Sequence, residues 1–135
     1  MSYAAAAALQ QAVFAHLTAD PALAAILGDA VHDTLPAGPL PPLYLSLGPE
    51  TARDRSDGTA SGAEHEITLS VISEGAGFHL AKTAAAAVCD ALVAPDLILT
   101  RGRLVAMHFI RATAKRDSGG RRRIDLTFRA RLDDI

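Results

Sequence analysis

A strict alternation of apolar and polar residues near the end of the chain is the feature that most constrains the fold. Between residues 123 and 132 every second residue is apolar, and the residues between them are arginines, an aspartate and a threonine. Successive side chains of a strand point to opposite faces of a sheet, so this segment predicts a strand with one buried face and one face in water. The residues expected to point inward are Ile124, Leu126, Phe128, Ala130 and Leu132.

Four further segments extend the predicted sheet. Residues 64–73 alternate in the same way, and residues 43–50 show the same period over a shorter stretch. Residues 104–115 are separated from the last strand by the turn sequence RDSGGRR, so these two strands are expected to form a hairpin. Residues 30–35 are expected to form a short edge strand. The polar, glycine-containing residues 51–63 are expected to be a loop, and loops of this length are often functional.

Three segments predict helices. Residues 3–17 are nearly all good helix formers, and their larger apolar residues recur with a spacing of four. A short helix follows, with Asp20 as N-cap, Pro21 at the first helical position and Gly28 just past the end. Residues 78–92 again show helical spacing, with many alanines that permit close packing on a sheet.

The order of these elements predicts an α+β fold. We expect a mainly antiparallel sheet of four to five strands with the helices packed on one face, in a single domain over residues 1–135. A chain of this length can bury a hydrophobic core without disulfides or metals. Its one cysteine, Cys89, excludes an intrachain disulfide, and no apolar stretch is long enough for a membrane span.

The charge is distributed unevenly along the chain. Residues 1–100 carry 3 basic and 11 acidic side chains, whereas residues 101–135 carry 10 basic and 4 acidic ones. Two complementary surfaces suit head-to-tail association if the charges lie on separate faces, whereas they cancel if the two parts of the chain interleave. Only 4% of the residues are aromatic, which disfavours a nucleic-acid-binding surface built on base stacking.

A search for chemistry finds no catalytic, cofactor-binding or metal-binding constellation. Gly75 and Gly77 stand where a dinucleotide-binding glycine motif begins, but Leu80 replaces its third glycine. Glu64, His65 and Glu66 cannot chelate together on a regular strand, because the histidine points to the opposite face, and a solvated strand start is expected there. Cys89 is expected to be a buried small residue. No acid–base pair can be nominated.

A cluster of cations at the hairpin turn is the most unusual polar feature. It comprises Lys115, Arg116, Arg121, Arg122 and Arg123. Two interpretations remain open. The cluster is either a solvated hairpin end that resists aggregation or an electrostatic contact for an acidic partner surface or phosphates.

The sequence as a whole resembles the small tail-completion, or tail terminator, proteins encoded among phage and gene transfer agent tail genes, and among these the gene transfer agent members. The resemblance is carried by ARDRSDGTASGAEHEITLSVISEGAGFHLAKTAAAAVCDAL and LTRGRLVAMHFIRATAKRDSGGRRRIDLTFRARL, and includes the PPLYLSLG strand. Family members often have aromatics where this chain has Arg55 and Ile72.

The resemblance implies a structural subunit without catalysis or cofactor. It implies a homo-hexameric ring that caps the tail tube, contacts the tail tube protein and the head–tail connector or stopper protein, and lets DNA pass through its lumen without specific recognition or any membrane contact. The chain is then expected in the cytoplasm on synthesis and afterwards at the head–tail junction of the particle. The matching loop residues implied as assembly contacts are Arg53, Asp54, Ser56, Asp57 and Thr59.

A second hypothesis comes from a different class. The chain could instead be a small α+β module that binds a ligand or catalyses a reaction in a pocket that the sequence does not reveal. A deep pocket containing a titratable pair favours this alternative, whereas neighbouring tail genes favour the terminator.

Overall fold

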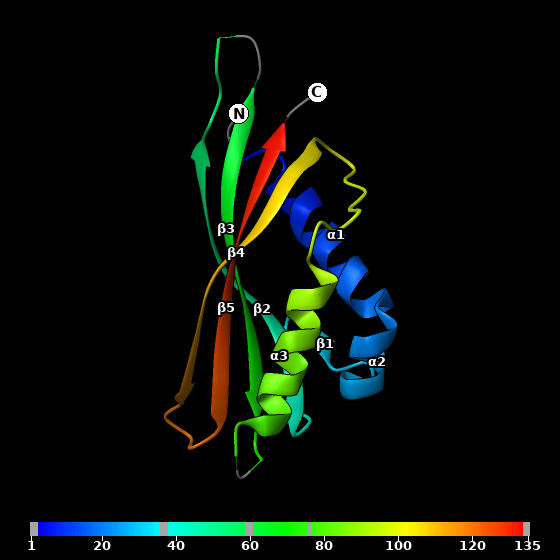
Figure 1. Cartoon of the computed structure of the whole chain (residues 1–135), viewed down its shortest axis with the longest axis vertical. Coiled ribbons are helices and arrows are strands. Elements are labelled where there is room, and N and C mark those ends of the chain that lie inside the picture. Colours follow the sequence, from blue (N-terminus) through cyan, green and yellow to red (C-terminus); the bar gives the residue numbers. More distant parts are fainter. Residues whose placement is uncertain (1–2, 36–37, 59–60, 76, 134–135) are drawn as a thin grey trace.

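A five-stranded sheet with three helices on one face forms the architecture, as Figure 1 shows. The computed structural model describes residues 3–35, 38–58, 61–75 and 77–133. The helices are α1 (Ala6–Ala19), α2 (Pro21–Leu27) and α3 (His79–Ala91). The strands are β1 (Val31–His32), β2 (Leu43–Asp54), β3 (Gly62–Ser73), β4 (Arg103–Arg116) and β5 (Arg122–Asp133). The α+β class predicted from the sequence is confirmed.

The strand order is β1-β2-β3-β5-β4. Only the short β1 pairs in parallel with its neighbour, and the other three pairings are antiparallel. The predicted hairpin is confirmed: β4 and β5 pair along their length and are joined by a turn between Asp117 and Arg121. Gly120 occupies this turn with a φ of 78°, a conformation that glycine adopts without strain.

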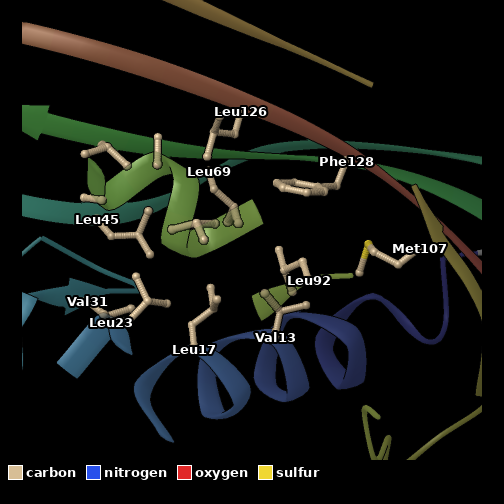
Figure 2. Close-up of a cluster of buried hydrophobic side chains, with 14 of the residues drawn as sticks. Val13, Leu17, Leu23, Val31, Leu45, Leu69, Leu92, Met107, Leu126 and Phe128 are labelled. Carbon is tan, nitrogen blue, oxygen red and sulfur yellow. The ribbon is translucent and has the colours of Figure 1, made fainter. Parts of the chain in front are cut away.

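The core lies between the sheet and the helices. The inward residues of β5 predicted from the alternation are all buried, with at most 3% of each side chain exposed. Figure 2 shows Leu69, Leu126 and Phe128 on the sheet pointing toward Val13 and Leu17 on α1. One face of the sheet therefore supplies most of the apolar burial that drives folding.

The short helix α2 begins and ends as the sequence predicts. The side chain of Asp20 accepts a hydrogen bond from the backbone N–H group of Leu23 at 3.0 Å, and Pro21 occupies the first turn. Gly28 ends the helix with a φ of 61° and donates its N–H group to the carbonyl oxygen of Ala24. Local capping chemistry, read from three residues, thus fixes both ends of this helix.

The loop predicted over residues 51–63 is correct only in its central part, and the prediction is wrong at both ends. Strand β2 continues to Asp54 and β3 begins at Gly62, so the connection between the two strands is about half the expected length. The added part of β2, residues 51–54, is exposed on both faces. A strand without a buried face has no apolar alternation, and its polar composition therefore looks like that of a loop.

None of the helices in the described part of the chain is long and apolar enough to cross a membrane.

Candidate assembly surfaces

The two groups of predicted contact residues lie at opposite ends of the sheet. The strand register places Arg53 of β2 opposite Glu64 of β3, whereas Lys115 of β4 lies level with Ile72 of β3 through Arg123. Eight residues separate these two levels, which is about 26 Å along a strand. The chain does not bring the two groups together, so they form two separate surfaces.

The first surface, which we call the loop end, is organised around Glu64. The carboxylate of this residue, with only 13% of its side chain exposed, is approached by three guanidinium groups. The Nε atoms of Arg53, Arg55 and Arg129 lie 3.9, 3.2 and 3.3 Å from its oxygens. Arg129 comes from the basic part of the sequence and Glu64 from the acidic part. The two parts therefore interleave here and their charges cancel, which is one of the two arrangements that the sequence left open.

The loop that leaves β2 is held by a local turn. Asp54 accepts hydrogen bonds from both the N–H group and the hydroxyl of Ser56, at 3.2 and 2.6 Å. Such side-chain turns substitute for backbone pairing at strand ends. Asp57 is exposed, and Thr59 lies outside the described residues. Four of the five loop residues implied by the resemblance thus lie at or directly beyond the end of β2.

The second surface, the hairpin end, is ordered by Asp117. Its carboxylate accepts from the N–H groups of Gly119 and Arg121 and pairs with the Arg121 guanidinium at 2.9 Å. Desolvation raises the pKa of Asp117, but these hydrogen bonds and the nearby positive charge outweigh it, so the pKa lies below its ordinary value. Arg121 also donates to the hydroxyl of Tyr44 on β2. Its charge has a structural role in the turn.

Arg123 and Lys115 share a second carboxylate, Asp125. Its oxygens lie 2.9 Å from Arg123 Nε and 3.7 Å from Lys115 Nζ, and the hydroxyl of Ser70 donates to it at 2.7 Å. Desolvation raises the pKa of Asp125, but the Ser70 hydroxyl, Arg123 and Lys115 lower it further, so the net shift is downward. The cationic cluster is thus partly neutralised by its own fold.

The remaining cations of the hairpin end differ in their surroundings. The Arg122 guanidinium lies over the ring of Phe78, 5.6 Å from its centroid, and donates to the carbonyl oxygen of Gly120. Arg116 is exposed at the end of β4. The hairpin end therefore combines positive charge that faces solvent with a rigid, internally bonded turn.

Sequence reasoning missed a polar cluster, centred on the buried His65, on the helix-covered face. The Nδ1–H group of His65 donates to Glu50 Oε2 at 2.9 Å, and the hydroxyl of Tyr3 donates to Glu50 Oε1 at 2.5 Å. This acceptor raises the pKa of Tyr3. His65 is fully buried, so the solvated strand start predicted there is wrong. Its pairing neighbours are Ala52 and Ala130, whose small side chains leave room for the imidazole.

The prediction that His65 faces away from the neighbouring carboxylates is nevertheless confirmed. Glu64 and Glu66 pair with arginines on the open face, whereas His65 lies among the residues under the helices. The pair of His65 and Glu50 is the titratable pair that the alternative hypothesis requires. However, the imidazole has no exposed surface, so it cannot exchange protons with a bound substrate.

A groove of about 490 Å³ beside this cluster opens between α1 and the sheet. Its lining includes Tyr3, Gln10, Phe14, Asp33 and Glu50. The amide of Gln10 donates to Asp33 across it. Among the described residues, no group of three His, Cys, Asp or Glu side chains is placed to hold a metal ion. Cys89 packs against the core as predicted but is only half-buried, and burial raises the pKa of its thiol, which disfavours nucleophilic reactivity.

Comparisons with known proteins identify the family of the chain. The profile of the family described as "Tail completion protein gp17" matches residues 11–133. A chain in the solved structure entitled "Virion of native gene transfer agent (GTA) particle" is 56% identical, with a TM-score of 0.92, and the match covers 98% of this chain and 99% of that one. No curated protein matches. The chain belongs to the tail completion protein gp17 family, a structural family and not a family of enzymes.

Proposed function

We propose that this protein is the tail terminator of a gene transfer agent particle. Six copies form a ring that caps the tail tube at its final length and offers the opposite side to the head-side connector. One observation carries the proposal. The chain matches a component of a gene transfer agent virion over nearly the full length of both chains at 56% identity, a level at which assembly surfaces are commonly retained along with the fold.

The arrangement of the two charged surfaces supports this role. A terminator must contact the tube on one side and the neck on the other, and the sheet carries different polar surfaces at its two ends. The loop end surrounds one carboxylate with arginines, whereas the hairpin end combines rigid turn contacts with outward cations such as Arg116. Two distinct ends on one subunit become two distinct sides of a ring when copies stand side by side.

The open face of the sheet supports passage of DNA without recognition. This face carries arginines paired with carboxylates, as for Arg129 with Glu64 and Arg123 with Asp125. Paired charges bind phosphates more weakly than free cations do, because each partner must first be displaced. We propose that this face lines the lumen of the ring, where paired charges let the duplex slide.

A genetic test in a producing host follows from the capping role. Loss of the gene is expected to give tubes of irregular length and heads without tails, and the wild-type gene is expected to restore joined particles. Normal tailed particles without the gene would contradict the proposal.

The same assay tests the hairpin end. The double change Lys115→Gln and Arg116→Gln removes two exposed positive charges and is expected to lower the yield of tailed particles at least tenfold while the melting temperature changes little. The matched control adds two negative charges elsewhere, by Ala15→Glu and Thr18→Glu on the exposed side of α1, and is expected to leave the yield unchanged. Equal yields from both variants would remove the hairpin end from the contact.

A further inference from the structure

Two stretches of strand edge in the described part of the chain have no partner strand. Strand β4 lies at one margin of the sheet and pairs only with β5. At the other margin β1 pairs with β2 only at Leu45 and Ser46, so no described strand pairs with residues 47–54 of β2 on their outer side. Unpaired edges expose backbone N–H and C=O groups that can pair with another chain.

The two halves of the β4 edge differ in how they are protected. Residues 111–116 include three cations, the type of side chain that keeps an edge from pairing. Residues 104–109 contain no Lys, Arg, Asp or Glu, and Val105 and Phe109 are 47% and 52% exposed. A groove of about 400 Å³ runs beside this half, between Ala94 and Pro95 on one side and residues 104–108 on the other. This apolar, unprotected half has the character of an interface.

The open part of β2 is shaped for an edge position. Pro49 has no N–H group to donate, and the register of β2 against β3 shifts between Leu47 and Glu50. Beyond this irregularity the strand regains regular pairing, and residues 51–54 are exposed. These four residues therefore form a short, regular edge that carries one charge of each sign, on Arg53 and Asp54, and no run of cations such as that at residues 111–116.

The register places the two edges at the same height. Thr51 of β2 lies opposite Glu66, which lies opposite Arg129, which lies opposite His108 of β4. By the same pairings Asp54 is level with Leu104. Figure 1 shows β2 and β4 at opposite margins of this half of the sheet. Strands β2 and β4 also run in opposite directions, because three successive antiparallel pairings separate them.

We propose that residues 51–54 of β2 in one copy pair with residues 104–108 of β4 in the next copy. Placed side by side in the same orientation, two copies bring these edges together as an antiparallel ladder. A contact between two different surfaces, repeated without a rise, closes into a ring when the rotation per subunit divides a full turn, and edges at equal height supply the absence of a rise. The inference rests on the proposed ring and names the surfaces that build it. Arg53 and Asp54 then lie in the junction between subunits.

Disulfide cross-linking tests this junction directly. In a Cys89→Ala background, Thr51→Cys and His108→Cys are introduced into the same full-length chain. Both positions are exposed, and the pairings above place them on the same, open face of the sheet. Directly opposed residues of an antiparallel pair lie close enough for a disulfide. Mild oxidation is expected to give a ladder of covalent oligomers that ends at six, with rings visible by negative-stain microscopy.

The controls separate this geometry from its competitors. Each single-cysteine variant is expected to remain uncrosslinked, because a head-to-tail contact never brings two copies of one position together. Thr51→Cys combined with Thr113→Cys moves the second cysteine four pairing levels along the sheet, from the level of Arg129 to that of Asp125, which is about 13 Å, and is expected to give less than a tenth of the cross-linked product. Thermal melting of each variant verifies that it is folded.

Three results would overturn the inference. Strong dimers from His108→Cys alone would show a two-fold contact between β4 edges. If the double variant forms rings that are visible by negative-stain microscopy but does not cross-link, the junction lies elsewhere and the proposed function still stands. Folded protein that forms neither rings nor cross-links would contradict the proposed ring as well.

Discussion

The two faces of the sheet are stabilised in different ways. On the covered face Phe128, Leu126 and Leu69 are nearly inaccessible to water and pack against the helices. On the open face Arg129, Asp125 and Glu64 occupy the alternate positions and are held by ion pairs and hydrogen bonds. Burial of apolar surface contributes much more to folding than partly exposed ion pairs do. The covered face therefore determines folding, and the open face and the rims remain available for assembly.

The largest expected effect on the free energy of unfolding comes from a substitution on the covered face. Phe128→Ala removes a side chain that is 1% exposed and is expected to cost about 3–5 kcal/mol of unfolding free energy, because the cavity cannot be filled by neighbours. Its ring packs edge-on against Phe109 on β4, which is 52% exposed. Phe109→Ala is the matched control, with an expected cost of about 1 kcal/mol. Urea denaturation measures both. Equal costs for the two variants would contradict the distinction between core and edge.

The buried polar cluster is expected to give the second largest effect. Glu50→Gln removes the carboxylate that accepts from both His65 and Tyr3 and is expected to cost about 1–3 kcal/mol, because His65 stays buried with a weaker partner. Glu66→Gln on the open face changes a carboxylate that lies 3.9 Å from Arg129, and is expected to cost less than about 1 kcal/mol. The same denaturation experiment compares them, and a reversed order would be inconsistent with this account.

On the open face, the stability difference between the wild type and an Asp125 variant is expected to depend on pH. The lowered pKa of Asp125 means that its contribution to stability is present above its unfolded pKa, near 4, and is lost as the pH falls through the folded value. Asp125→Asn is therefore expected to be less stable than the wild type by about 1 kcal/mol at pH 7, and the difference is expected to shrink below pH 4. Melting temperatures of both proteins between pH 7 and pH 3 measure this. A difference that stays constant would argue against ion pairing as its origin.

The smallest expected effect on stability lies at the loop end. Arg55→Ala removes one of three guanidinium groups around Glu64 and is expected to change the unfolding free energy by less than about 0.5 kcal/mol, because its side chain is 45% exposed. The expected effect on assembly is larger, since this residue lies directly beyond the edge of β2. Stability and ring yield, measured on the same preparation, separate the two. A loss of stability that matched the loss of rings would assign Arg55 to folding.

Sequence reasoning predicts the covered face well because its signal is local. The alternation in β5 and the capping residues Asp20 and Gly28 each fix a structural element within a few positions. The hairpin was predictable for the same reason. The length of β2 was not, since residues 51–54 have no buried face and therefore no apolar period.

The buried cluster escaped prediction because it depends on register. Leu43, Leu45 and Leu47 point to the covered face. If this alternation continued without interruption, Glu50 would point to the open face. The irregularity between Leu47 and Glu50 shifts the parity of β2, so that Glu50 points to the covered face and meets His65. No pattern within β2 or β3 alone reveals a pairing that forms only when the two strands align.

The most direct test of the central claim, that copies of this chain join through their sheet edges into a ring, is the mass of the purified protein in solution. Light scattering at low and high salt, combined with negative-stain microscopy, measures it. The expected result at both salt concentrations is a ring of about six times the 14.1 kDa mass of one chain, because the proposed junction consists of backbone pairing beside apolar residues, which salt screens little. A mass of one subunit at every concentration and salt, or a two-fold dimer, would contradict the claim.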